Sequence, residues 1–133
     1  MPKFHAVAPL LLVANVQESA NYYRDKLGFQ YDRFWGEPPC FCIAGRDSLM
    51  VMLSQVPPGD PVDTPFRAAE GVWNAYFWVD DAQALHDEWA ARGVTIVCPP
   101  TKMVYGQLEF TIRDLDGHAI GIGQPIEGDE SCS

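Results

Sequence analysis

The sequence predicts an α+β domain with two halves of the same plan, each a strand, a helix and three further strands. The second half repeats the first at an offset of 66 residues, so that residues 13–15 align with residues 79–81 and Tyr23 aligns with Trp89. In each half an apolar run leads into a polar helix-capping residue, an amphipathic helix and Gly-containing turns. Such a repeat favours a cleft lined by equivalent positions of the two halves.

The first half opens with a nearly continuous apolar run over residues 6–14, which predicts a buried strand. Asn15 is placed to cap the next helix, and Gly28 to end it. The apolar side chains of this helix recur at steps of four, three and four residues: Val16, Ala20, Tyr23 and Leu27. Further strands are predicted at 29–35, 40–44 and 48–55, with Gly45-Arg46-Asp47 as the turn between the last two.

The second half is predicted to begin with a strand over residues 72–79, followed by a helix that Asp80 or Asp81 caps. Its apolar stripe is Ala82, Leu85 and Trp89, and Gly93 ends it. Strands then follow at 94–98, 107–113 and 118–124, with residues 114–117 as a hairpin turn.

The two modules, at about 5–55 and 72–124, are separated by a proline-rich linker at 56–71. Prolines resist both helix and strand pairing, so this segment is either a passive connection or in part a lid. The length suits one domain, predicted over residues 1–126. The acidic tail 127–133 is expected to be disordered.

The composition excludes several classes of partner. A formal charge of −9 and a pI near 4.5 disfavour nucleic acid, whose phosphates repel an acidic protein. No apolar run is long enough to span a membrane. The four cysteines show no zinc-binding spacing, and reduced thiols in a cytoplasmic protein are the simplest interpretation.

Catalytic motifs are not apparent. The glycine patterns of dinucleotide and phosphate sites and the local signatures of nucleophilic catalysis are missing from the sequence. His86 is expected at the surface of its helix and His118 in local hairpin geometry. A metal site formed by His5, His118 and Glu109 is an alternative, although the spacing of these residues in the sequence does not indicate that they converge on one ion.

Aromatic residues are the more promising set. Strand alternation puts Asn74, Tyr76 and Trp78 on one face, with Met50, Met52 and Ser54 on a corresponding face of the first half. Phe34, Trp35 and Tyr105 lie near strand ends and loops. Tyr76 and Tyr105 are weighed evenly between ligand contact and core, whereas core is favoured for Trp78 and Trp89.

Two motifs carry a family resemblance. Residues 15–29, from Asn15-Val16-Gln17 to Leu27-Gly28-Phe29, and the pair of stretches 105–110 and 113–118 near the C-terminus are both distinctive. They resemble the first-helix signature and the last hairpin of the vicinal oxygen chelate superfamily, which includes glyoxalase I, extradiol dioxygenases and bleomycin-resistance proteins. The binding proteins of the bleomycin-resistance type are the most similar group.

This resemblance implies paired βαβββ modules that form a cup-shaped mixed sheet, usually in a homodimer. In enzymatic members the cup holds a divalent metal, whose ligand positions correspond here to Ala8, Met52, Asn74 and Gly121. Ala8 and Gly121 offer no donor atom, a thioether is too soft for magnesium, manganese or ferrous iron, and an amide oxygen is a weak ligand. We therefore expect no metal cofactor, with a divalent metal as the alternative.

The function favoured is binding without catalysis: sequestration of a planar or cationic small molecule in an aromatic cleft. The candidate ligand-binding residues are Tyr76, Tyr105, Phe34, Trp35, Met52 and Asn74; the resemblance itself points to Tyr76, Tyr105 and Phe34. One alternative is a metal-dependent lyase or dioxygenase of the same superfamily with a shifted ligand set. Another is a non-catalytic interaction module whose cup is closed.

Overall fold

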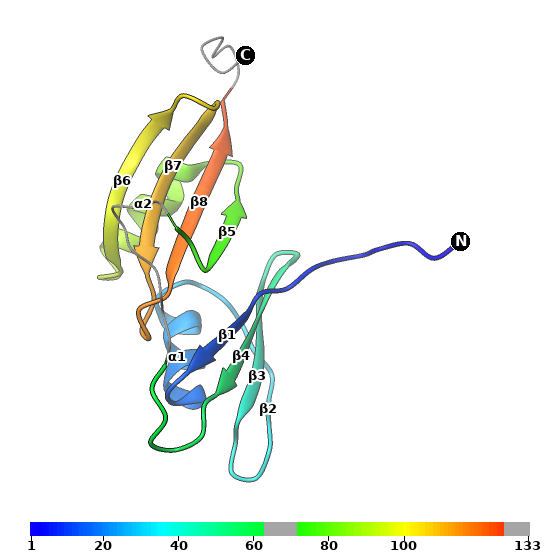
Figure 1. Cartoon of the computed structure of the whole chain (residues 1–133). Helices are drawn as coiled ribbons and strands as arrows, with labels where there is room; N and C mark the ends of the chain where they lie inside the picture. The colour runs from blue at the N-terminus through cyan, green and yellow to red at the C-terminus, as the bar shows by residue number, and fades with distance from the viewer. Residues whose placement is uncertain (63–71, 127–133) are drawn as a thin grey trace. The chain divides into compact units, whose positions relative to one another are not determined.

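The computed structural model describes residues 1–62 and 72–126 and divides the chain into two compact units, Met1–Asp63 and Thr64–Ser133. The division falls inside the predicted linker 56–71. The rest of that linker, from residue 63, and the predicted tail 127–133 lie outside the described residues. Each unit is described separately below (Figure 1).

The first unit is a four-stranded mixed sheet with one helix. Its elements are β1 (Leu10–Val13), α1 (Val16–Asp25), β2 (Phe34–Trp35), β3 (Phe41–Arg46) and β4 (Leu49–Gln55). The strand order is β1-β4-β3-β2, in which β1 runs parallel to β4 and the other neighbours are antiparallel.

The second unit repeats this plan. Its elements are β5 (Ala75–Trp78), α2 (Ala82–Ala91), β6 (Thr95–Met103), β7 (Gln107–Arg113) and β8 (Ala119–Pro125). The order β5-β8-β7-β6, with β5 parallel to β8, matches that of the first sheet strand for strand. The predicted α+β fold of two βαβββ modules is confirmed.

Both helices begin as the sequence predicts. The Asn15 side-chain oxygen accepts the Glu18 amide at 3.0 Å, and the Asp81 side-chain oxygen accepts the Ala84 amide at 2.9 Å, so Asp81 is the cap of α2. Each cap satisfies an amide that has no partner within the first turn. Gly28 has a positive φ of 80° just beyond α1, as expected for a helix-ending glycine.

A second interaction fixes each helix start to its own sheet. The first amide of α1, on Val16, donates to the Gln55 side chain at the end of β4, and that of α2, on Ala82, donates to Gln124 in β8, both at 2.9 Å. Each glutamine therefore satisfies a helix amide with an oxygen from the last strand of the module. The repeat extends to this detail of hydrogen bonding.

Each helix covers one face of its sheet with apolar side chains. Tyr23 of α1 and Trp89 of α2, which align in the repeat, are 1% and 2% exposed. Trp89 packs edge-on to Phe110 of β7 with ring centroids 5.9 Å apart. Fully buried strand residues complete the two cores: Val13, Cys42, Ala44, Val51 and Leu53 in the first unit, and Ile112, Ile120 and Ile122 in the second.

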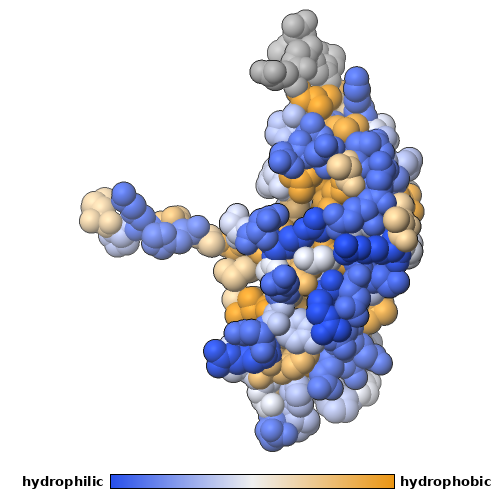
Figure 2. All heavy atoms as spheres, turned by 180° about the vertical axis from the view of Figure 1, so that it is seen from behind, coloured by the Kyte–Doolittle hydropathy of each residue, from blue (hydrophilic) through white to orange (hydrophobic). Residues whose placement is uncertain are grey.

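Several element boundaries differ from prediction. The strand predicted over 6–14 begins at Leu10, and residues 1–9 form an extended arm, visible in Figures 1 and 2, in which Phe4 and Val7 are exposed. Pro9 has no amide hydrogen, so only its carbonyl pairs, with the Met52 amide.

Two other elements of the first unit differ in extent or place. The predicted strand 29–35 shortens to the two residues of β2. The β3–β4 turn is centred on Asp47 and Ser48 and not on 45–47, because Asp47 adopts the positive φ of 54° that a tight hairpin needs.

The strand β6 is longer than the predicted 94–98 and contains Pro99 and Pro100. Its pairing with β7 shifts register between Ile96 and Thr101, on either side of these prolines. Proline is tolerated in a sheet at an edge strand or a bulge, and β6 is an edge strand of its sheet.

Within the described ranges, no helix is long and apolar enough to cross a membrane. The surface seen in Figure 2 is mostly hydrophilic, with apolar side chains scattered among polar ones. The three described cysteines, Cys40, Cys42 and Cys98, are free. Burial raises the pKa of the Cys42 thiol to about 11, which favours the protonated thiol at neutral pH.

Candidate functional site

The second sheet has one face against α2 and one face opposite it. Strand alternation and the pairing register assign the face opposite α2 to Tyr76 and Trp78 of β5, Gly121 and Gly123 of β8, and Gln107, Glu109 and Thr111 of β7. Tyr76 pairs with Gly121 and Trp78 with Gly123, while Glu109 pairs with Gly123 from the other side. Polar and aromatic side chains therefore meet across a strand of glycines.

The two glycines give Tyr76 room to lie across β8. A Cβ atom at Gly121 would lie 2.6 Å from the Tyr76 ring and 2.7 Å from the Trp73 indole nitrogen. At Gly123 it would collide with the Tyr76 hydroxyl and lie 2.7 Å from Oε1 of Gln107. Both glycines are therefore needed for side chains of β5 and β7 to reach each other.

Glu109 is the centre of this face. Its Oε1 accepts hydrogen bonds from the Tyr76 hydroxyl at 2.9 Å and from the Tyr105 hydroxyl at 2.7 Å. The Glu109 residue is only 7% exposed, although Tyr105, in the β6–β7 turn, is half exposed. We refer to Tyr76, Glu109 and Tyr105 as the Glu109 cluster.

The phenols of the Glu109 cluster are poor acids. Desolvation, then the hydrogen bond to Glu109 and its charge, raise the pKa of Tyr105 to about 12, and the same causes raise the pKa of Tyr76 further. Each phenol is stabilised in its neutral, donating form. At neutral pH both therefore remain protonated and orient one oxygen of the carboxylate.

Three aromatic rings run along the β5 side of this face. Tyr76 contacts Trp73 and Trp78 edge-on, with ring centroids 4.9 Å apart in both pairs. The Trp73 indole donates to the Thr111 hydroxyl at 3.1 Å. Trp78 is 67% exposed, so the expectation that it belongs to the core is wrong, whereas Trp89 is buried as predicted. Alternation put Trp78 on the right face but does not tell which face is covered.

Asn74 has a structural role in the described geometry. Its side-chain oxygen accepts the Ala119 amide at 2.9 Å, and its own amide donates to the Ala119 carbonyl at 2.8 Å. The side chain thus extends the pairing of β5 with β8. Its oxygen, the only metal-donor candidate that the resemblance assigns to this unit, is already engaged.

The metal that enzymatic relatives imply does not fit these residues. Gly121 has no donor, and the space a side chain would use there is filled by Tyr76 and Trp73. The Asn74 side-chain oxygen already accepts a backbone hydrogen bond. Met52 offers only a thioether, and Ala8 has no donor atom in its side chain. A catalytic metal takes about three protein ligands, which these four positions do not supply.

The alternative metal set is not brought together either. Glu109 lies four residues along β7 from Arg113, where the hairpin to His118 begins, a separation of roughly 13 Å at the usual strand rise. His118 is buried, with its Nδ1 3.1 Å from the Asp114 carboxylate, and Asp114 Oδ1 also accepts the amides of Asp116 and His118. These contacts close the hairpin, which confirms the local role predicted for His118. His5 belongs to the exposed N-terminal arm of the first unit.

The Asp114, Asp116 and His118 side chains present donor atoms within 4.8 Å of one another. Asp114 already accepts hydrogen bonds from the backbone amides of Asp116 and His118, so the structure gives this group a role in closing the β7–β8 turn.

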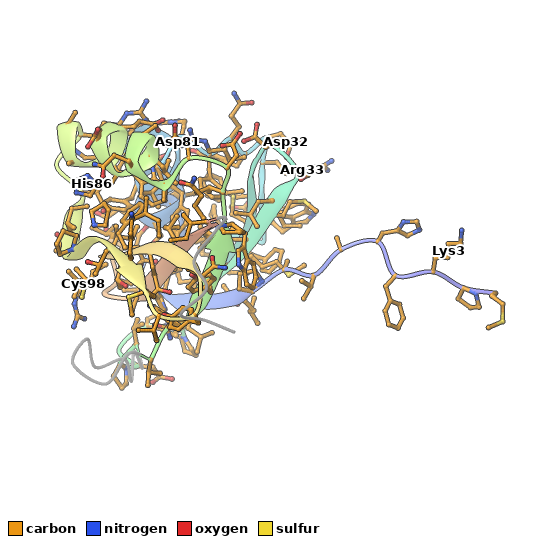
Figure 3. The ribbon with its side chains drawn as sticks, turned by 90° about the horizontal axis from the view of Figure 1, so that it is seen from above. Lys3, Asp32, Arg33, Asp81, His86 and Cys98 are labelled. Atoms are coloured by element: carbon orange, nitrogen blue, oxygen red, sulfur yellow. The ribbon has the colours of Figure 1, made fainter. Side chains whose placement is uncertain are left out.

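His86 lies along α2 beyond the cap Asp81, as Figure 3 shows. Its ring is edge-on to Phe110 with a centroid distance of 5.5 Å and its side chain is 20% exposed, so the exposure predicted for it is only partial.

The first unit separates its predicted site residues by face. Met52 pairs with Ile43, and Trp35 pairs with Phe41, placing Met52 and Trp35 on the face opposite α1. Phe34 alternates onto the other face, where it pairs with the buried Cys42 and its ring lies 5.0 Å from that of Tyr31. Phe34 is thus not brought together with Trp35 and Met52.

The sequence gives Tyr76 and Tyr105 as candidate ligand contacts, which stay predictions, and the structure adds the Glu109 carboxylate to which both hydroxyls donate. Glu109 is a candidate from the sequence only in the alternative metal set, and Gln107 and Trp73 are not among the sequence candidates. A signal was present: polar residues alternate at 107, 109 and 111, and glycines at 121 and 123. These patterns predict a polar face on one strand and, on the other strand, a face on which two positions have no side chain.

The comparisons with known proteins agree with this architecture. The model of the Glyoxalase/Bleomycin resistance protein/Dioxygenase superfamily matches residues 3–122. The chain belongs to this superfamily. No curated protein matches it significantly in sequence.

Solved structures share the α+β fold of this superfamily at low sequence identity. TioX from Micromonospora sp. ML1 is 17% identical with a TM-score of 0.70, covering 91% of this chain and 100% of its own. A glyoxalase/bleomycin resistance protein/dioxygenase from Nocardioides is 14% identical with a TM-score of 0.69, over 96% and 87%. TnmS3, described as an antibiotic binding protein from Streptomyces sp. CB03234, is 21% identical with a TM-score of 0.63, over 93% and 99%.

Proposed function

We propose that this chain is a metal-independent small-molecule-binding protein that sequesters a planar or cationic ligand on the face opposite α2. The observation that carries the proposal is the Glu109 cluster, in which two phenols converge on one buried carboxylate beside an exposed tryptophan. Where enzymatic relatives place metal ligands, this chain has glycine and an amide already bound to backbone.

The aromatic side chains supply the binding energy in this proposal. The contributing rings are those of Trp73, Tyr76 and Trp78, which contact one another edge-on. Of the three, Trp78 is the most exposed. Stacking and cation–π contacts contribute about 0.5–2 kcal/mol each. Several such contacts together with buried area reach micromolar affinity, near −8 kcal/mol.

The mechanism is retention without chemistry. Tight binding lowers the free concentration of the ligand and leaves its bonds intact. TnmS3, which shares the fold, is described as an antibiotic binding protein, and a role in antibiotic resistance through sequestration is the corresponding proposal here. The proposed state of the protein is a cytoplasmic homodimer. Separately, Trp35 and Met52 of the first unit remain sequence-based predictions of ligand contacts.

The test is a titration of the protein's tryptophan fluorescence with planar aromatic dyes, such as the cation acridine orange and a neutral anthraquinone. We expect Tyr76→Ala and Tyr105→Ala to weaken binding of the best dye about tenfold, because each loses ring contact and releases Glu109 from one hydrogen bond.

The matched control is Tyr31→Ala, which removes a tyrosine of the first unit that donates to Asn21. Circular dichroism checks that the variants fold. Unchanged affinity in both Tyr76 and Tyr105 variants, or equal weakening by Tyr31→Ala, contradicts the assigned site.

A further inference from the structure

In the Glu109 cluster, the carboxylate of Glu109 is positioned by two neutral phenol hydroxyls. Oε1 of Glu109 takes both phenol hydrogen bonds, and no hydrogen bond to Oε2 is made by the residues described. Over residues 1–62 and 72–126, no arginine, lysine or histidine forms an ion pair with this carboxylate. Among residues 1–62 and 72–126, the two phenols position the carboxylate and no side chain supplies it with a positive charge.

A second acceptor lies beside it. Oε1 of Gln107 is a buried oxygen without a hydrogen-bond partner among the described residues. It lies 2.7 Å from the point above Gly123 that the Tyr76 hydroxyl also approaches. Gln107 and Glu109 are two residues apart on β7, so their side chains extend from the same face.

Acceptors of this kind favour a donor from outside the chain. A buried amide oxygen left without a donor costs about 1–3 kcal/mol, and a buried carboxylate without a cation costs more. Both costs fall when one group with several N–H donors and a positive charge lies against the two oxygens. A net charge of −9 raises the local concentration of such cations further.

We propose that the ligand is an aromatic cation whose N–H groups bind Oε2 of Glu109 and Oε1 of Gln107. The flat ring lies against Tyr76 and the exposed Trp78, and an amidinium, guanidinium or ammonium group faces β7. This inference rests on the proposed function and selects the charged class from the planar or cationic ligands that it allows.

The test compares two probes of nearly the same shape. 2-Naphthamidine carries a positive charge and several N–H donors, whereas 2-naphthamide is neutral. Tryptophan fluorescence and calorimetry give the dissociation constant of each. We expect the amidine to bind at least tenfold more tightly to the unmodified chain, a difference of about 1.4 kcal/mol.

Variants assign the preference to the two acceptors. Glu109→Gln keeps the shape and removes the charge, and we expect it to reduce the preference to within about twofold. Gln107→Leu removes only the second acceptor and is expected to reduce it severalfold, which keeps the test usable if the Glu109 variant does not fold. Glu88→Gln, which removes the same charge from α2, is the control and leaves the preference unchanged.

The outcomes separate this inference from the proposed function. Equal binding of the two probes, or a preference that survives both β7 variants, overturns the inference while sequestration stands. Binding of the neutral anthraquinone without binding of the amidine does the same. If neither probe nor any dye of the wider series binds detectably, the inference and the proposed function are both overturned.

Discussion

At the scale of single residues, the two tyrosines of the Glu109 cluster differ in setting but serve one purpose. Tyr76 lies across β8 in the space left by Gly121 and Gly123, whereas Tyr105 reaches Glu109 from the β6–β7 turn. Neutral donors orient a carboxylate without cancelling its charge, which an arginine in the same place would do. In our proposal the ligand itself supplies the positive charge.

Alkaline pH is expected to weaken the second unit through Tyr105. Its pKa is near 10 in an unfolded chain and about 12 in the fold, so the fold favours the protonated phenol. That stabilisation is complete below pH 10 and disappears as the pH rises towards 12. We therefore expect the free energy of unfolding to fall across this interval.

The measurement is a set of urea unfolding curves between pH 8 and 12, together with tyrosinate absorbance. In Glu109→Gln the hydrogen-bonded charge is absent, so the titration of Tyr105 should move back towards 10. A Tyr105→Phe variant with the same loss of stability at alkaline pH as the unmodified chain would argue against this assignment.

At the scale of elements, strand β8 determines what its neighbours can do. Its inner face carries Ile120 and Ile122 against the core, and its outer positions 121 and 123 are glycine. Because β8 lies between β5 and β7, side chains from these two strands meet only across it. Glycines in the middle of a strand normally weaken it, so their presence here indicates a close approach of other groups.

Adding one methyl group to β8 is expected to disrupt this contact. Gly123→Ala places a Cβ against the Tyr76 hydroxyl, and overpacking of this kind costs about 1–3 kcal/mol. Urea unfolding measures the loss. Gly45→Ala in β3 is the control, since its nearest neighbour is the Leu49 carbonyl oxygen at 3.3 Å and a smaller loss is expected.

A double-mutant cycle identifies the cause. In a Tyr76→Ala background the same Gly123→Ala change should cost at least about 1 kcal/mol less, because the colliding ring is gone. If the two changes are additive, Tyr76 does not lie over Gly123.

Hydrophobic periodicity made most elements predictable, and side-chain contacts across strands did not follow from it. The strand 107–113 and the caps Asn15 and Asp81 are as expected because they depend on local pattern. The contact of Tyr76 with Glu109 joins residues 33 apart and depends on the register of three strands. Pattern alone does not reveal such a register.

Alternation also leaves exposure undetermined. The predicted face of Trp78 is correct, but its predicted burial is not. The sequence pattern of an apolar strand is the same whether or not other elements cover that face. Phe34 and Trp35 are both candidates because they lie near strand ends and loops, but as adjacent residues of β2 they point to opposite faces of the sheet.

At the scale of the whole molecule, two units with the same plan have diverged in chemistry. The face opposite α1 carries apolar side chains such as Met52 and Trp35, and the face opposite α2 carries the Glu109 cluster. Membership of the superfamily accounts for the shared plan. It does not decide between binding and catalysis, because both occur on this fold.

The most direct test of the central claim is to titrate one protein sample with acridine orange before and after dialysis against a chelator, with elemental analysis of both samples. We predict the same dissociation constant in both and no stoichiometric nickel, zinc, manganese or iron. One metal ion per chain that survives ordinary dialysis, and whose removal abolishes dye binding, would contradict the account.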